Sequence, residues 1–370
     1  MVGYFALIFL IVILLLYSKI NKEYGFKELK IERNVKDYRV EIGEDIFLTT
    51  IIENNKWLPI SFLHVEEKLP KNLVTELNKE DIDFFIAIKG YERAKKNIKI
   101  RAEKRGVYLL KGMRISLGDV LGFNLETKDI EDYKEIVVYP KIISLEAFNI
   151  ESNNLQGENI IKRWIYQDPI FIKGIREYNV EDRMKDIHWP TSLRMDKLMV
   201  REYDYSSDRE LVVIFNAQGG IPFYKCIDEE IIEKGISITI SIINEISKMG
   251  LPIGLWTNAN IASYNNEFKN KVEPFVNSYE RILELCGRIT LPSREDFSAF
   301  LSSNLPCFRK NAVYIIIASF LDEASISSLY KLNNVRMSIK LIDISRDSSL
   351  PNVSGIEKLI LKGEERDGTI

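Results

Sequence analysis

The sequence predicts an all-β domain followed by an α/β domain, behind one apolar helix near the N-terminus. Residues 2–17 carry no charge. From about residue 29 to residue 140, apolar and polar side chains alternate with a period of two, which is typical of half-buried strands. From residue 210 onward, short apolar runs alternate with helical patterns, which indicates a mostly parallel sheet.

Length and composition are those of a globular protein. The 370 residues are enough for two domains, and 46% are hydrophobic and 28% charged. The formal net charge is −3 and no dense basic patch occurs, which argues against a nucleic-acid partner. Cys226, Cys286 and Cys307 are widely spaced, so they predict buried thiols rather than disulfides or a zinc site.

Residues 2–18 predict a single transmembrane anchor. The uncharged run Val2–Tyr17 is at the short end of the about 17–25 residues that span a bilayer, and Lys19 and Lys22 can extend it by reaching the interface. A secretory signal peptide would need basic residues before the run and a small-residue cleavage site after it, and this sequence has neither.

Basic residues follow the apolar run and none precedes it. They are Lys19, Lys22, Lys27, Lys30 and Arg33. The positive-inside rule then places everything after the helix in the cytoplasm. We therefore expect a single-pass protein of the cell membrane whose soluble domains are cytoplasmic.

Residues 28–140 are expected to form a β-sandwich-like domain. Many short strands separated by turn signals, with little helical periodicity, are typical of this architecture. The predicted strands are Leu29–Arg33, Asp45–Ile52, Ile82–Ile88, Asn97–Arg101, Gly106–Leu110 and Glu135–Tyr139. His64 has apolar neighbours and is expected to be packed rather than to bind a ligand.

Residues 141–209 are expected to be a connector and residues 210–362 the α/β domain. Leu211–Phe215 is apolar throughout, as in a strand that is covered on both faces. The later elements are predicted as a helix at 223–249, a strand at 252–256, a helix at 279–286, a strand at 312–317, a helix at 324–332 and a strand at 338–344. Gly250 is the expected C-terminal cap of the long helix, and residues 363–370 are expected to form a flexible tail.

The connector contains arginines, acids and aromatic residues at a definite spacing. It reads Gly174-x-Arg176-x-Tyr178-x-x-x-Asp182, then Ile187-His188-Trp189, Ser192-x-Arg194 and Val200-Arg201-Glu202. This resembles the bacterial family called domain of unknown function 58, whose pattern is G-x-R-x-Y-x-x-x-D, I-H-W, S-x-R and V-R-E. Upstream landmarks of the family are matched by Arg105–Tyr108, Gly118–Phe123 and Val138–Pro140.

The resemblance implies a membrane protein with a β-rich region and a C-terminal von Willebrand A-like domain, which has a Rossmann-like, mostly parallel sheet. It also implies association with a MoxR-type AAA+ ATPase, and no reaction is established for the family. Typical members carry two N-terminal spans, whereas this sequence shows one. We therefore expect an anchored adaptor or scaffold that binds protein partners, with no catalytic activity and no cofactor.

Two roles are open to the signature residues. These residues are Arg176, Tyr178, Asp182, His188, Trp189, Ser192, Arg194, Arg201 and Glu202. In the first role, the arginines and acids form an ion network that fastens the segment to the α/β domain, with Tyr178 and Trp189 as apolar anchors. This structural or interface role is our prediction.

In the second role, the signature belongs to a membrane-associated hydrolase. His188 would be its general base, oriented by Asp182 or Asp186. Arginines of the signature would hold an anion. A nucleophile elbow, a P-loop and an H-E-x-x-H motif are all absent from the sequence, which disfavours this alternative.

Von Willebrand A domains often bind a divalent cation through Asp-x-Ser-x-Ser after the first strand. The corresponding stretch here is Asn216-Ala217-Gln218-Gly219-Gly220, without the acid or either hydroxyl. Asn216, Gln218 and Gly220 therefore predict a degenerate site that holds no metal, and Ser319 or Asp322 could assist only weakly. A third alternative, an extracytoplasmic adhesion-type module, would need a competent cation site and the opposite topology.

Overall fold

The structure is a computed structural model that describes residues 4, 9, 19–20, 23–76, 79–118, 125–143, 149–150, 172–179, 182, 184–203, 210–264, 268–335 and 337–362. The chain divides into two compact units, Met1–Tyr139 and Pro140–Ile370, and each is described by itself. No helix among the described residues has the length and apolar character needed to span a membrane. Apart from Tyr4 and Phe9, the predicted anchor at 2–18 lies outside the described residues, as does the predicted tail at 363–370.

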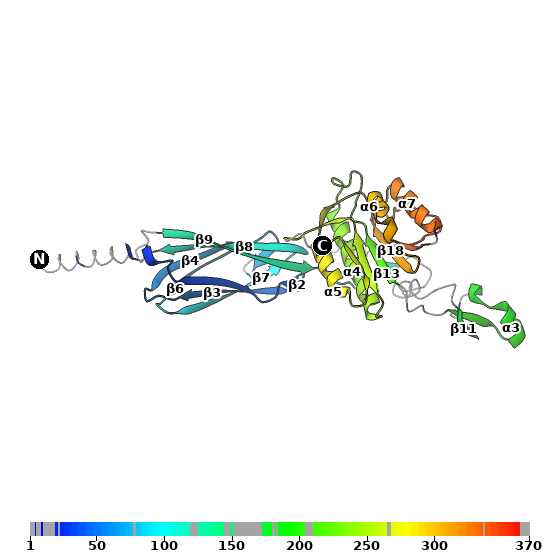
Figure 1. Ribbon diagram of the computed structural model, residues 1–370, viewed down its shortest axis with the longest axis horizontal. Helices are drawn as coiled ribbons and strands as arrows, with labels where there is room; N and C mark the ends of the chain where they lie inside the picture. Colours follow the sequence, from blue (N-terminus) through cyan, green and yellow to red (C-terminus); the bar gives the residue numbers. More distant parts are fainter. Residues whose placement is uncertain are drawn as a thin grey trace, which may run out of the picture. The chain divides into compact units, whose positions relative to one another are not determined.

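The first unit consists of two β-sheets (Figure 1). Its strands are β1 Leu29–Val35, β2 Arg39–Glu41, β3 Asp45–Asn54, β4 Ile60–Lys68, β5 Leu73–Thr75, β6 Asp81–Ile88, β7 Arg93–Ala102, β8 Gly106–Gly118 and β9 Leu125–Tyr139. One sheet has the order β1-β3-β7-β5 and the other β2-β9-β8-β4-β6. Neighbouring strands are antiparallel except β2 and β9, which run parallel.

Alternate side chains of both sheets form a common core. Ile46 and Leu48 of β3 cluster with Leu110 of β8 and Ile136 of β9, and each is at most 1% exposed. The period-two pattern of the sequence is therefore the pattern of this core, and the predicted β-rich region is confirmed. The sequence does not predict β4, because its inward-facing series of Leu63 and Val65 continues with the acid Glu67, which breaks the apolar alternation.

A buried ion pair crosses this core. Arg33 of β1 contacts Glu67 of β4, and their side chains are 0% and 3% exposed. The Nε atom of Arg33 also lies 3.4 Å from a carboxylate oxygen of Asp132 on β9. Burial raises the pKa of Glu67 to about 7, although the positive charge of Arg33 acts in the opposite direction. Arg33 therefore joins the two sheets through polar contacts inside an apolar core.

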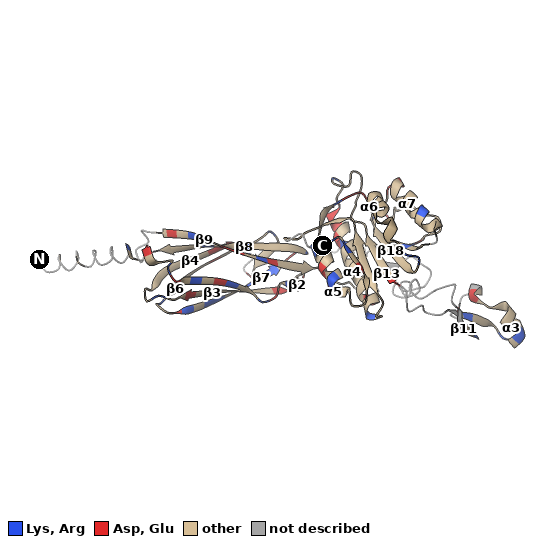
Figure 2. Ribbon diagram, in the orientation of Figure 1, with Lys and Arg blue, Asp and Glu red and all other residues tan. Residues whose placement is uncertain are grey.

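Charged residues of both signs are mixed along the described strands of this unit (Figure 2). On β7, Lys99 and Arg101 each pair with Asp45 of β3 at 2.8 Å. Arg93 of β7 pairs with Glu53 of β3 at 2.9 Å. Two acids of β3 thus pair with three of the basic residues of β7.

The second unit contains a seven-stranded mixed sheet. Its strands are β10 Asn149–Ile150, β13 Glu210–Phe215, β14 Ile253–Thr257, β16 Lys271–Phe275, β18 Ala312–Ala318, β19 Ser338–Asp343 and β20 Glu357–Lys362. Their order is β10-β20-β19-β18-β13-β14-β16. The edge strands β10 and β16 are antiparallel to their neighbours, and the strands between them are parallel.

Helices cover both faces of this sheet. They are α4 Glu229–Lys248, α5 Tyr279–Arg288, α6 Phe297–Asn304 and α7 Glu323–Asn334. The first two pack on one face and the last two on the other (Figure 1). Phe215 of β13 points into the first core and Ile214 into the second. After Glu210 the strand is apolar, because it is covered on both sides.

The long helix α4 begins at Glu229 rather than at the predicted Phe223. Asp228 is its N-cap, and the Asp228 carboxylate accepts a hydrogen bond from the Ile231 N–H at 3.2 Å. An acidic N-cap favours the start of a helix at the next residue, because its carboxylate accepts a hydrogen bond from an N–H group that has no partner within the helix. The prediction for the other end is confirmed, since Gly250 has φ 73° and its N–H bonds to Ser247 O at 3.0 Å.

The prediction of buried cysteines is correct only for Cys286. Cys226 and Cys307 are exposed, and all three thiols are free. Cys226 lies in the turn before α4, and Cys307 ends the short 3-10 helix Leu305–Cys307. Sparse thiols predict burial only on average, and both of these fall in connections on the surface.

Candidate functional site

The signature residues fold into a small module, defined here as residues 172–203. It contains β11 (Ile172–Glu177), the 3-10 helix η2 (Met184–Asp186), α3 (Trp189–Met195) and β12 (Met199–Tyr203). The strands β11 and β12 form an antiparallel pair, and β11 and α3 are labelled in Figure 1. Part of the predicted connector 141–209 is thus a folded unit.

Arg176 and Asp182 form a bidentate ion pair in the module. The two terminal nitrogens of Arg176 lie 2.6 and 2.7 Å from the two carboxylate oxygens of Asp182. The Asn179 N–H also donates to this carboxylate, at 2.7 Å. The hydrogen bonds from Arg176 hold the pKa of Asp182 below its usual value. The structure therefore brings together two of the predicted residues, and their pairing closes the turn after β11.

His188 is the N-cap of α3. Its Nδ1 atom accepts a hydrogen bond from the Thr191 N–H at 3.3 Å and lies 2.8 Å from the Thr191 hydroxyl oxygen. The His188 main-chain N–H donates to Met199 O at 2.8 Å. Asp182, which the hydrolase alternative places beside His188, is instead held by Arg176. The contacts of His188 are those of a capping residue.

The Ser192 hydroxyl ties α3 to β12. Ser192 is buried, accepts a hydrogen bond from the Met199 N–H at 2.8 Å, and donates to His188 O at 3.0 Å. A hydroxyl has a single proton, and here a main-chain oxygen receives it. The serine of the signature therefore has a structural use and is not placed as a nucleophile.

The remaining signature residues are spread over the module. Tyr178 is half-buried and its N–H donates to Leu198 O at 2.8 Å. Arg194 is exposed in the last turn of α3, where a cation stabilises the helix dipole, and Arg201 is exposed on β12. The main chain of Glu202 pairs with Gly174 of β11.

Large apolar side chains of the module are exposed, contrary to the prediction that Trp189 is an apolar anchor. They are Ile175, Met184, Trp189, Leu193, Met195 and Leu198. Trp189 is 57% exposed and Leu193 is 81% exposed. These two residues are four apart on α3 and so share one face of the helix. Arg176, Asp182, His188 and Ser192 are thus engaged in contacts within the module, whereas these six apolar side chains face solvent.

Amide side chains occupy the carboxyl ends of the central strands, where open α/β sheets usually bind ligands. Asn216 follows β13, and its Nδ2 atom donates to Phe320 O at 2.8 Å. Its Oδ1 atom accepts from the Gln218 N–H and from Asn258 Nδ2, both at 3.0 Å. Asn216 and Asn258 are each at most 1% exposed.

The same network uses the other amide oxygens. The oxygen of Asn258 accepts from the Ala217 N–H at 2.8 Å, and the oxygen of Gln218 accepts from the Phe297 N–H at 2.9 Å. The carboxylate of Asp322 caps α7 by accepting from the Ser325 N–H at 2.9 Å. Oxygens that accept N–H donors in this way are not directed at a cation. Among the described residues, no three His, Cys, Asp or Glu side chains are grouped to hold a metal.

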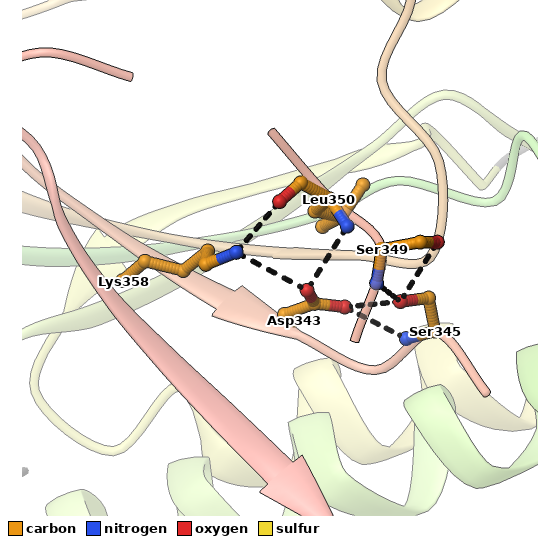
Figure 3. A network of polar contacts seen from close by, with 5 residues as sticks. All are labelled: Asp343, Ser345, Ser349, Leu350 and Lys358. Atoms are coloured by element: carbon orange, nitrogen blue, oxygen red, sulfur yellow. Dashed lines mark hydrogen bonds and ion pairs between the residues drawn. The ribbon is translucent and has the colours of Figure 1, made fainter. Parts of the chain in front are cut away.

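An Asp-x-Ser pair does occur in the sheet, at the end of β19 (Figure 3). Asp343 is 1% exposed and accepts from the N–H and the hydroxyl of Ser345 at 2.9 and 2.6 Å. It also accepts from the Leu350 N–H at 3.2 Å and lies 3.7 Å from Lys358 Nζ. The ammonium group of Lys358 therefore neutralises this carboxylate. The sequence analysis did not predict this network, although Asp343-x-Ser345 directly at the end of an apolar strand is a visible pattern.

Comparison with known proteins extends the resemblance. The family model "Protein of unknown function DUF58" matches residues 174–369. Uncharacterized protein YeaD of Bacillus subtilis (strain 168) is 22% identical over 258 residues, which are 68% of this chain and 61% of that protein. The chain thus spans about three fifths of the length of the curated relative that it matches.

Similar solved structures cover smaller parts of the chain. A non-cellulosomal cohesin from the hyperthermophilic archaeon Archaeoglobus fulgidus is 17% identical over 30% of this chain and 86% of that one, with a TM-score of 0.20. The CARDB domain of the PF1109 protein from Pyrococcus furiosus, in complex with di-metal ions, is 10% identical over 28% and 90% of the two chains, with a TM-score of 0.19. Scores this low carry no conclusion about fold or function.

The family model covers the signature module from its third residue onward and every strand of the seven-stranded sheet except β10. Its match begins at Gly174, where the signature begins, and extends over more than half of the 370 residues. The protein therefore belongs to the DUF58 family.

Proposed function

We propose that this protein is a membrane-anchored, non-catalytic adaptor whose signature module docks a protein partner, with a MoxR-type AAA+ ATPase as the expected partner. The anchor is the uncharged run Val2–Tyr17, and the basic residues that follow it favour a cytoplasmic location for the rest of the chain. We also infer a von Willebrand A-like class for the α/β domain, which is supported by a mostly parallel sheet with helices on both faces.

One observation carries the docking proposal. Within the module, Arg176, Asp182, His188 and Ser192 are engaged in internal contacts, whereas Trp189 is exposed. A catalytic site would direct its polar groups at a substrate. Exposed apolar side chains on a small rigid unit are instead typical of a surface that a protein partner covers.

Crosslinking in native membranes tests the proposal. The double variant Trp189→Ser, Leu193→Ser is compared with the matched double variant Tyr330→Ser, Val335→Ser, whose residues are also exposed, in and just after α7. Loss of two hot-spot side chains should lower the yield of crosslinked ATPase by about tenfold or more. Equal crosslinking of the two double variants would contradict docking through the module.

The hydrolase alternative has a separate test. His188→Ala removes the cap of α3. If His188 has only a structural role, the variant should loosen the module and should cause no loss of a catalytic activity. A folded His188→Ala protein that keeps its partner but loses a measurable turnover would establish catalysis instead.

Two native cysteines can be used to test on which side of the membrane the α/β domain lies. Cys226 and Cys307 are exposed in the α/β domain, whereas Cys286 is buried and serves as the internal control. An impermeant thiol reagent should label neither exposed cysteine in intact cells and both after lysis. Labelling in intact cells would favour the extracytoplasmic adhesion-type alternative.

A further inference from the structure

Three segments of the β-rich unit meet at the end where the chain enters β1. They are residues 24–28 before β1, residues 55–59 between β3 and β4, and residues 89–92 between β6 and β7. The Asn55 N–H donates to Glu28 O at 3.0 Å, and the Tyr91 N–H donates to Lys56 O at 3.1 Å. The three segments therefore lie side by side.

Two buried polar side chains hold these segments in place. Nζ of Lys56 donates to two main-chain oxygens of the first segment, at 2.7 and 3.0 Å. Nδ2 of Asn54 donates to the main-chain oxygens of Leu58 and Lys89, both at 2.9 Å. Lys56 is 8% exposed and Asn54 is 0% exposed. These four hydrogen bonds tie the three segments together, although the buried Oδ1 atom of Asn54 accepts no hydrogen bond from the described residues.

Large aromatic side chains project from these hydrogen-bonded segments into solvent. Trp57 is 69% exposed, Tyr91 is 74% exposed and Tyr24 is 44% exposed. Tyr91 also has φ 59°, a left-handed conformation that disfavours a bulky residue and suits glycine or asparagine. A tyrosine kept in such a conformation with its side chain exposed points to a role outside the fold.

The chemistry of these side chains points to lipid. Tryptophan and tyrosine combine an apolar ring with a polar group, and they concentrate where a membrane meets water. The uncharged run Val2–Tyr17 precedes this end in the sequence. We propose that Tyr24, Trp57 and Tyr91, named the aromatic end, rest in the headgroup region of the bilayer and hold the β-rich unit against the membrane. This inference rests on the proposed membrane anchor.

Charge is balanced around the aromatic end. Lys27 and Lys89 are exposed, but so are Glu23, Glu28 and Glu92. Attraction to anionic lipid is therefore not the driving force, because acids accompany the lysines. Contact with the bilayer should be equally strong on neutral and on anionic membranes.

The test uses the full chain reconstituted into phosphatidylcholine vesicles, with and without phosphatidylglycerol. The fluorescence of Trp57 is obtained as the difference between the unchanged chain and Trp57→Phe. Phosphatidylcholine that is brominated near the headgroup end of its acyl chains should quench roughly half of the Trp57 fluorescence or more, with or without phosphatidylglycerol. The matched control is Trp256→Phe, because Trp256 is 1% exposed and its component should not be quenched.

Each outcome separates the inference from the proposed anchor. A chain that floats with the vesicles while its Trp57 component is quenched supports the aromatic end as a lipid contact. A chain that floats with an unquenched Trp57 component overturns the inference and leaves the anchor standing. A Trp57 component that is protected from an aqueous quencher and is also not quenched by brominated lipid would assign the contact to protein and would overturn the inference. Failure to float would contradict the anchor itself.

Discussion

Both terminal nitrogens of Arg176 bind the carboxylate of Asp182, at 2.6 and 2.7 Å. The family signature thus contains at least one pair whose members stabilise each other. The same module leaves Trp189 and Leu193 in solvent. This contrast between engaged polar groups and exposed apolar side chains supports the proposed docking role.

Replacing Asp182 with Asn should loosen the module without unfolding the α/β domain. The Arg176 side chain is 44% exposed, so solvent screens the pair and its loss should cost only about 0.5–1 kcal/mol. Hydrogen exchange should rise in residues 172–203 and stay unchanged in the central sheet. The control is Glu177→Gln, which removes a more exposed pair with Lys197 and should have little effect.

The same pair should make the module sensitive to acid. The pKa of Asp182 is lower in the folded state than in the unfolded chain, where it is about 3.9. The ionised Asp182 therefore stabilises the folded module above the unfolded-state pKa, and this stabilisation is lost as the pH falls through the lowered folded-state pKa. Exchange rates corrected for intrinsic chemistry should show this loss in the unchanged chain. If Asp182→Asn shows the same acid transition, another group is responsible.

Removing Arg33 should strongly destabilise the β-rich unit. Its side chain is 0% exposed and contacts Glu67. Arg33→Ala leaves a buried carboxyl group without its partner, a change that costs about 3–5 kcal/mol in buried pairs. Chemical denaturation followed by the fluorescence of Trp57 measures this loss. The control is Arg114→Ala, which replaces an exposed arginine. If the two variants lose a similar free energy of unfolding, the role of the Arg33–Glu67 pair in the core is contradicted.

Glu67 should give the β-rich unit a pH-dependent stability. Burial raises its folded pKa to about 7, whereas the unfolded value is about 4.3. Between these values the folded state holds a proton that the unfolded chain has released. The free energy of unfolding should therefore fall as the pH rises and level off above about pH 7. Glu67→Gln should flatten this slope, and an unchanged slope would assign it elsewhere.

The amide network should resist conversion into a cation site. Asn216→Asp restores an acid after the first strand of the sheet, but it removes the donor to Phe320 O. An unpaired buried oxygen costs about 1–3 kcal/mol. We expect a lower unfolding temperature and no tight Mg²⁺ or Mn²⁺ binding by calorimetry, in either the unchanged chain or the variant. One-to-one tight binding by the unchanged chain would contradict the degenerate site.

Asp343 should be a stabilising centre of the sheet rather than a ligand. Asp343→Asn leaves Lys358 without its anion and loses an acceptor, with an expected cost of about 3 kcal/mol. Asp347→Asn is the matched control, because Asp347 is exposed in the same loop. Thermal unfolding of the two variants should differ by several degrees. Equal unfolding temperatures would contradict a central role for the Asp343 network.

Periodicity predicted the larger elements and missed those that depend on their neighbours. The strand β18 and the helix α7 are close to their predicted bounds, since each has a continuous pattern of its own. The edge strand β16 and the helix α6 are short, and β16 contains Pro274. Such elements form because an adjacent strand or core is already in place, which a local pattern does not reveal.

The spacing of the signature was readable, but the use of each residue was not. The sequence placed Arg176 and Asp182 in one motif, whereas only the structure pairs them and turns His188 toward Thr191. Trp189 was expected to be an apolar anchor of the segment, yet its side chain is exposed. A side chain's partner depends on the path of the chain between them, and that path is set by main-chain pairing of β11 with β12.

The sequence alone determined the β-rich and α/β organisation, the apolar run Val2–Tyr17 and family membership, because each follows from a local pattern or a spacing. Tertiary structure alone decided that Arg33 and Glu67 meet inside a core and that Asn216 and Asn258 close the ends of two neighbouring strands. Residues far apart in the chain become partners only when strands pair, and burial then determines whether a polar group stabilises the fold or remains free to bind.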